Sequence, residues 1–184
     1  MPRKLATNRG MELQERQAVR VVLCQGVCEG QKVDLDLSAL LLGADGKLSG
    51  DDAIVFYGTS PTCDGSPGAV TLKGDLKEGA DEEISIRLAR IDSRTASILF
   101  VITSFSEHVP IDLGGVRGWS VRVLDERSGE ELCRHDMAGD MSGFTSMGIA
   151  VIRREGNGWT FHAIEEPIGR SSNGLEDVVR KYCR

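Results

Sequence analysis

Carboxylate side chains that could bind a cation are concentrated in one region of this sequence. Between Asp34 and Glu83 there are 11 acidic residues and 3 lysines, a local charge balance of −8. The rest of the chain carries 17 acidic and 19 basic residues and is therefore close to neutral. Carboxylates that gather at the rim of a sheet repel one another unless a cation or basic side chains lie between them. The region between Asp34 and Glu83 is therefore a candidate site for a divalent cation.

Calcium is the cation that suits these residue types. Asp34 and Asp36 are two apart on a predicted strand, so both side chains point to one side while Leu35 and Leu37 point to the other. Further acids precede the next strand or follow a glycine-rich stretch: Asp51, Asp52, Asp75, Glu78, Asp81, Glu82 and Glu83. Calcium takes 6–8 oxygen ligands and tolerates the irregular geometry of loops. The sequence contains no EF-hand spacing, and the alternative is that these acids cap turns and keep the surface soluble.

Other chemistry is less well supported by the spacing. Cys133 and His135 lie two apart and could share a strand face, where a histidine activates a thiolate, or they could be a small buried Cys beside a surface His. A paired-carboxylate hydrolase would need a cleft and two acids in different environments, and no GxSxG or HExxH motif accompanies the acids. Five cysteines without CxxC spacing, and three histidines without close pairing, disfavour a zinc site. We therefore expect a protein that is not an enzyme.

The elements that must position the acids are mostly strands. Apolar residues alternate with polar ones at Ile84–Leu88, Trp119–Val123 and Ile149–Arg153. More continuous apolar runs predict strands that are buried on both faces or lie at a sheet centre, at Ala18–Cys24, Leu35–Leu42, Ala53–Tyr57 and Ser97–Phe105. Turns are predicted at Ala44–Lys47, Arg127–Glu130 and Glu155–Gly158. The stretch from Thr59 to Gly79, rich in Gly, Pro, Ser and Asp, is predicted to be irregular for most of its length.

The end of the chain predicts one helix on this β scaffold. Leu175, Val178, Val179 and Tyr182 fall on one helical face. Ser172 or Asn173 can cap its N-terminus. The expected fold is therefore mostly β: a β-sandwich of two antiparallel sheets with a C-terminal helix.

Length and composition limit the organisation and the partners of the chain. With 184 residues it is long enough for one domain with a proper core. We expect a disordered N-terminal end at residues 1–9 and a single domain at residues 10–184. The longest apolar runs have five residues, so no membrane span is expected, and the N-terminus has no apolar stretch typical of a secretory signal. A net charge of −6 disfavours nucleic acid as a partner, and the simplest location is the cytoplasm.

The order of several short motifs resembles the TerD family of tellurium-resistance and stress-response proteins. The first half carries Val33–Leu42, Gly46-Lys47, Ile54–Tyr57, Asp64-Gly65-Ser66, Gly74-Asp75 and Asp81-Glu82. The second half carries Phe100–Thr103, Arg122-Val123, Glu131-Leu132, Gly158–Phe161 and Gly174-Leu175. The resemblance covers the chain from about Gly10 onward, and the collinear order makes it specific although each piece alone is weak.

The resemblance implies a cytoplasmic β-sandwich that binds calcium in acidic loops at one end and has no established catalytic activity. Transferred position by position, the implied ligands are Asp34, Asp36, Asp75, Glu78, Asp81 and Glu82. The expected function is a calcium-binding stress-response protein that acts by binding protein partners of unknown identity. The alternative is a protein-interaction module of the same fold that has lost metal binding.

Departures from the family pattern remove possible oxygen donors. The family's Gly-Trp-Asp corresponds to Gln25-Gly26-Val27, so an aromatic and a carboxylate are missing. Gly58 stands where the family has Asn. Leu76 takes the place of the Asn in the family's Gly-Asp-Asn, and Ala80 stands where the family has an Asp. Since calcium affinity falls with ligand number and charge, we hypothesise one weak site or none in place of the usual two.

Overall fold

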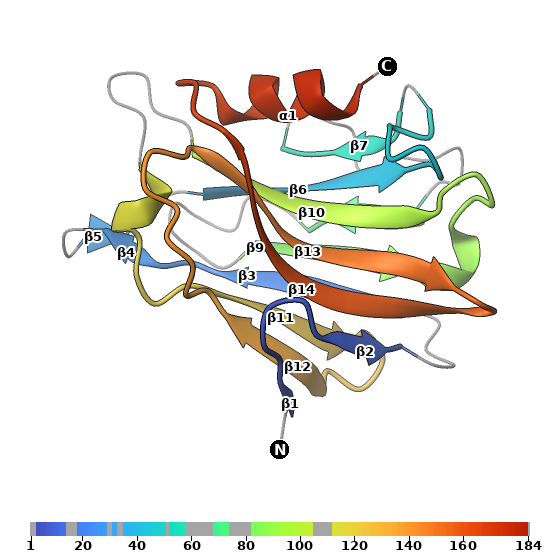
Figure 1. The fold of residues 1–184 in the computed structure, drawn as a ribbon. Helices are drawn as coiled ribbons and strands as arrows, with labels where there is room; N and C mark the ends of the chain where they lie inside the picture. Colours follow the sequence, from blue (N-terminus) through green and yellow to red (C-terminus); the bar gives the residue numbers. More distant parts are fainter. Residues whose placement is uncertain are drawn as a thin grey trace.

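The chain folds into two β-sheets that pack face to face, with one helix at the C-terminal end (Figure 1). The structure, a computed structural model, describes residues 3–13, 18–28, 31–32, 35–50, 52–57, 68–73, 82–104 and 112–183. Within these ranges each of the two large sheets has six strands, and a two-stranded ribbon stands apart. The predicted mostly β sandwich with a C-terminal helix is confirmed.

The first sheet, sheet A, contains the strands that hold the second half of the acidic region. Its strands are, in spatial order, β1 (Arg3–Lys4), β12 (Glu131–Asp136), β11 (Ser120–Asp125), β3 (Ala18–Cys24), β9 (Glu82–Arg87) and β8 (Val70–Leu72). All neighbours pair antiparallel except β1 and β12, which are parallel. β8 lies inside the stretch that the composition predicts to be mostly irregular.

The second sheet, sheet B, contains the strand that follows Asp34. Its strands are, in spatial order, β2 (Gly10–Glu12), β14 (Gly158–Gly169), β13 (Ser146–Glu155), β10 (Ser97–Ser104), β6 (Leu35–Leu42) and β7 (Ile54–Val55). All of these pairs are antiparallel. The remaining elements are the ribbon β4 (Val27–Cys28) and β5 (Gln31–Lys32), and the 3-10 turns η1 (Leu88–Arg90) and η2 (Leu113–Gly115).

Buried apolar side chains from both sheets fill the space between them. β6 and β10 are almost continuously buried, as their apolar runs predict. Ala53–Tyr57 differs from the prediction of a doubly buried strand, because only two residues of it pair with β6 at the sheet edge and Tyr57 is 65% exposed. Trp119, Trp159 and Phe161 are core residues.

Helix α1 (Gly174–Tyr182) docks on sheet B and closes one edge of the sandwich, at the top of Figure 1. Asn173 caps it by accepting a hydrogen bond from the Glu176 amide. Val178 and Tyr182 are buried, while Val179 remains exposed. The predicted helix is therefore confirmed, with a narrower buried face than the apolar spacing indicates. No described helix is long and apolar enough to cross a membrane.

An N-terminal strap, residues 3–13, closes the opposite side of the sandwich, at the bottom of Figure 1. It pairs with both sheets: β1 adds to β12 in sheet A, and β2 adds to β14 in sheet B. Leu5 and Leu13 are buried anchors in it. The sequence-based expectation of a disordered end at residues 1–9 differs from this arrangement, because at residues 3–9 β1 pairs with β12, Leu5 is buried and the Asn8 amide donates to the Ala163 carbonyl oxygen.

Candidate functional site

Two neighbouring glutamates on β9 point to opposite faces of sheet A. Glu82 lies opposite the buried Leu23 and points inward, while Glu83 lies opposite Val22 and points outward. The Glu82 carboxylate reaches sheet B, where its Oε2 accepts a hydrogen bond from the Leu37 amide at 2.5 Å. This bond joins the start of β9 to the start of β6.

Asp36 lies on β6 beside that bond. Leu35 and Leu37 on either side of it are buried, and Asp36 itself is half-buried, which confirms the alternation predicted for this residue. Asp36 pairs with Thr103 of β10. Because the Leu37 amide is linked to Asp36 by one peptide group, Asp36 and the Glu82 carboxylate both lie near the start of β6, at the end of the sandwich here called the acidic end.

The other predicted ligands lie outside the described residues. These are Asp34, Asp75, Glu78 and Asp81. In the sequence, Asp34 comes directly before β6 and Asp81 directly before β9. Among the residues whose placement is described, no three His, Cys, Asp or Glu side chains gather closely enough to hold a metal ion. Four of the six predicted ligands are not part of that search.

The donor set at the acidic end suits calcium chemically. Asp36 and Glu82 offer hard carboxylate oxygens from two strands of different sheets. The backbone carbonyl of Leu35 lies next to Asp36, and the Gln25 side chain donates a hydrogen bond to it at 2.9 Å. Gln25 stands in the stretch where the family pattern has its Gly-Trp-Asp, so an amide donor here occupies one lone pair of an oxygen beside Asp36.

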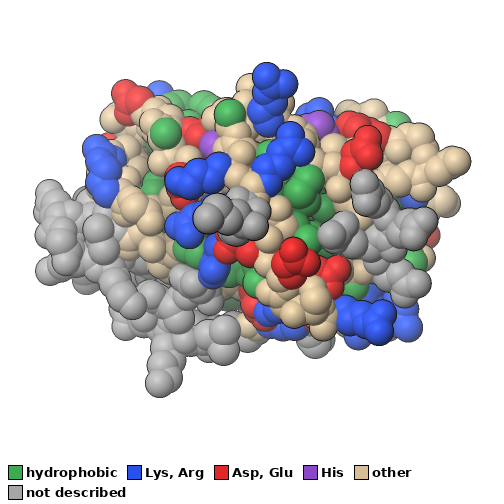
Figure 2. All heavy atoms as spheres, turned by 90° about the horizontal axis from the view of Figure 1, so that it is seen from below, with side chains coloured by type: hydrophobic (Ala, Val, Ile, Leu, Met, Phe, Trp, Pro, Cys, Tyr) green, Lys and Arg blue, Asp and Glu red, His purple; other side chains and the backbone are tan. Residues whose placement is uncertain are grey.

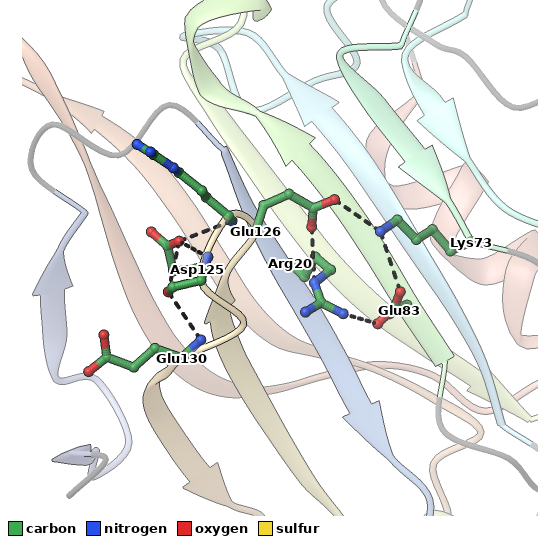
Figure 3. A network of polar contacts seen from close by, with 8 residues as sticks. Arg20, Lys73, Glu83, Asp125, Glu126 and Glu130 are labelled. Atoms are coloured by element: carbon green, nitrogen blue, oxygen red, sulfur yellow. Dashed lines mark hydrogen bonds and ion pairs between the residues drawn. The ribbon is translucent and has the colours of Figure 1, made fainter.

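Glu83 belongs to a compensated network on the outer face of sheet A (Figure 3). Its carboxylate contacts Arg20 Nη1 at 3.0 Å and Lys73 Nζ at 3.6 Å. Glu126, from the turn between β11 and β12, contacts the same two cations, at 3.0 Å each. Two acids and two bases therefore balance on this face, and Glu83 is occupied by structural ion pairs. The family resemblance implied Glu82 and not Glu83 as a ligand, whereas composition alone placed both in one acidic run.

Some acidic residues stabilise turns, which is the role that the alternative to a calcium site assigns to acids. Asp45 accepts a hydrogen bond from the Lys47 amide in the predicted turn at Ala44–Lys47. Asp125 accepts from the Arg127 and Ser128 amides at the start of the predicted turn between β11 and β12 (Figure 3). These carboxylates stabilise the backbone of tight turns.

Cys133 and His135 share the inner face of β12, and neither activates the other. Burial raises the pKa of the Cys133 thiol to about 12, so the reactive thiolate is disfavoured. His135 is buried, which corrects the expected surface position, and its ring contacts Leu5 and Glu165. Sequence reasoning did not single out Glu165, because no local spacing connects it to His135.

Comparison with known proteins assigns the chain to a family. The sequence pattern that defines the TerD domain matches residues 1–182. This chain belongs to the TerD family. It is 32% identical over 159 residues to the tellurium resistance protein TerD of Serratia marcescens, covering 84% of this chain and 80% of that relative. It is 34% identical over 140 residues to general stress protein 16U of Bacillus subtilis, covering 73% of this chain and 71% of the relative.

Solved structures of TerD relatives share the fold. The crystal structure of a homologue of the telluride resistance protein from Streptomyces coelicolor A3(2) matches with a TM-score of 0.63 at 19% identity. The match covers 84% of this chain and 91% of that one. The two-sheet architecture is therefore that of TerD proteins, and the resemblance seen in the collinear motifs is confirmed.

One departure from the TerD pattern has a structural basis. The resemblance places Gly26 where the family has Trp, and a Cβ atom added at Gly26 would lie 2.6 Å from the Val116 side chain and 2.7 Å from the Arg117 carbonyl oxygen. The loop that carries η2 therefore fills the space beside residue 26. An aromatic side chain could not enter this position without moving that loop.

Proposed function

We propose that this TerD protein binds calcium at its acidic end and acts in a stress or metal-resistance response by binding rather than by catalysis. Asp36 and Glu82 would hold the ion together with Asp34, Asp75, Glu78 and Asp81. The proposed partners are the calcium ion and other proteins, and the proposed location is the cytoplasm. The names of the relatives, tellurium resistance protein and general stress protein, support the biological setting.

The hydrogen bond between Glu82 and the Leu37 amide carries this proposal. It brings a carboxylate of sheet A to the residue next to Asp36 in sheet B, although the two acids are 46 positions apart in the sequence. The local excess of negative charge favours a cation here, and a bound calcium ion would hold the ends of the two sheets together.

Mixed surface charge supports a role other than nucleic-acid binding. Figure 2 views the molecule from below, and on the described part of this face Lys and Arg side chains are interspersed with Asp and Glu. A nucleic-acid interface requires a basic patch or stripe. The overall charge of −6 points the same way.

Calorimetric titration of calcium into chelator-treated protein tests the proposal. We expect binding by the wild type and at least about tenfold weaker binding by Glu82→Gln, because the amide keeps the bond from Leu37 but removes a charged ligand. Glu83→Gln is the matched control, since Glu83 lies next in sequence but contacts Arg20 and Lys73. Its calcium affinity should equal that of the wild type.

Two results would contradict the proposal. One is the absence of binding heat at millimolar calcium, which would support the alternative of an interaction module without a metal site. The other is equal loss of affinity in Glu82→Gln and Glu83→Gln, which would show a general effect of surface charge in place of a defined site.

A further inference from the structure

A buried histidine and glutamate connect the N-terminal strap to both sheets. His135 on β12 and Glu165 on β14 have side chains only 4% and 7% exposed, and His135 Nε2 lies 2.7 Å from Glu165 Oε1. The other ring nitrogen, Nδ1, lies 3.0 Å from the Leu5 carbonyl oxygen in the strap. The pair therefore links sheet A, sheet B and the strap at one point.

Glu165 collects further hydrogen bonds from the strap and from the loop after β12. The Thr7 hydroxyl donates to its Oε1 at 3.2 Å, and the Gly139 amide donates to its Oε2 at 2.5 Å. The Ala138 amide makes a longer contact with Oε1, at 3.4 Å. A methyl group on Gly139 would overlap the Glu165 carboxylate, so the loop packs directly on it. Release of Glu165 would free the strap and this loop together.

The positions of the acceptors determine where protons must lie. A carbonyl oxygen only accepts, so His135 Nδ1 must carry a proton and donate it to Leu5. The contact between Nε2 and Glu165 Oε1 then needs one further proton between those two atoms, on either side. Without it two lone pairs would face each other at 2.7 Å, with a carboxylate buried beside them.

We propose that His135 and Glu165 form a proton-dependent latch that holds the N-terminal strap against the sandwich and releases it as the pH rises. The latch is closed while the shared proton is present, at lower pH, and opens when that proton is lost. Since β1 and β2 pair with β12 and β14, release bares the edges of both sheets. The latch does not depend on calcium at the acidic end.

The other titratable groups near His135 and Glu165 either stay neutral or have partners of their own. Cys133 lies on the same face of β12, and burial raises its pKa to about 12, so it stays neutral over the relevant range. On the outer face, Lys4 and Arg134 both contact Asp136, at 3.0 and 2.8 Å. In the loop, Asp140 accepts from Ser142, and on β14 His162 contacts Glu155 at 3.1 Å. His162 also lies beside Gly10 of the strap, which makes it a useful control.

Hydrogen exchange of strap amides, corrected for the intrinsic rate, tests the latch. The Leu5 and Asn8 amides bond to Arg134 and Ala163 carbonyls, and amides of β10 serve as the core reference. Between about pH 6 and about pH 9 we expect the wild-type protection of Leu5 and Asn8 to fall at least about tenfold relative to β10. In the same titration, ¹⁵N shifts of the His135 ring should show proton loss from Nε2 with the same midpoint.

Glu165→Gln is the decisive variant. Its amide can donate to Nε2 of a neutral His135, so no shared proton is needed and strap protection should be equal at both pH values. His162→Gln should keep the wild-type loss of protection. The proposal is overturned if the wild-type strap stays protected at high pH or if Glu165→Gln loses protection as the wild type does. It is also overturned if the ring and the strap titrate at different pH, a comparison that needs no variant.

Discussion

Two carboxylates join the sheets on opposite sides of the sandwich, and they are held in different ways. Glu82 reaches from sheet A to a backbone amide of β6, beside Asp36 in the acidic region. Glu165 reaches from sheet B to a buried histidine, with the strap and a loop donating to the same carboxylate. The first contact is made in a region with a large excess of negative charge, and the second is made with a partner that can carry positive charge.

The difference indicates what each side of the sandwich responds to. At the acidic end, stability should depend on a cation that offsets the negative charge. At the strap, the protein supplies its own compensation through the proton on His135, so stability should depend on pH. Under the two proposals, contacts that join the sheets on the two sides of the sandwich respond to different solution variables.

Removing the carboxylate should cost far more at the strap than at the acidic end. Glu165→Ala breaks a buried pair and leaves His135 and two loop amides without their acceptor, so we expect a loss of about 3–5 kcal/mol. Glu82→Ala loses the hydrogen bond from the Leu37 amide but lowers the local excess of negative charge, so without calcium we expect a loss of only about 1–2 kcal/mol. Urea unfolding of both variants makes the comparison. Equal losses would show that the acidic end is as tightly compensated as the strap.

Calcium should stabilise the acidic end alone. At a free concentration about 100 times its Kd, a ligand adds about 2.7 kcal/mol, which for a chain of this size raises Tm by about 5–10 °C. Glu165→Gln should keep the full rise, whereas Glu82→Gln should lose most of it. Thermal melts with calcium and with chelator measure this. A rise that depends on Glu165 would contradict the separation of the two sides.

Asp177, outside the acidic region, also accepts a hydrogen bond from a backbone amide and can be compared with Glu82. The Ser171 amide donates to it at 2.9 Å, and that hydrogen bond is the main cause that lowers the pKa of Asp177. An acid with a lowered pKa contributes stability above its ordinary value near 4 and loses it as the pH falls through the lowered one. Asp177→Asn should therefore cost about 1.5 kcal/mol at neutral pH. The gap to wild type should close as the pH falls below the ordinary value near 4, in urea unfolding at each pH.

The smallest effect is expected for Glu83, the neighbour of Glu82. Its contacts with Arg20 and Lys73 are partly exposed, with 19% of the Glu83 side chain accessible, so Glu83→Gln should cost less than about 1 kcal/mol. High salt should reduce that cost further, because these charges are screened. Denaturation midpoints at low and high salt check this. A cost that is insensitive to salt would mean that Glu83 acts through packing and not through charge.

Local patterns predicted most of the scaffold. The apolar runs at Ala18–Cys24 and Leu35–Leu42 coincide with β3 and β6, because side chains buried between or within sheets leave a long apolar signal. Alternation also identified the inward leucines around Asp36. The sequence predicted too long a strand around Ile54–Val55. Five consecutive apolar residues are compatible both with a buried central strand and with a short edge strand.

The candidate sites were harder to predict than the scaffold. The acidic residues were visible as a local excess of charge, but the different roles of Glu82 and Glu83 follow from which face of sheet A each one occupies. The part of the strap within residues 1–9 was expected to be disordered because its few residues form no pattern of their own. Its order comes from Leu5 and from the open edges of β12 and β14.

The amino-acid sequence by itself determined most of the long strands, the turns, the C-terminal helix and the placement of negative charge, because these depend on periodicity and composition along the chain. Only the tertiary structure decided which charges meet. His135 and Glu165 are 30 positions apart, and Glu82 bonds to an amide 45 positions away. Such contacts depend on how two sheets face each other, and no local pattern of residues encodes that distance.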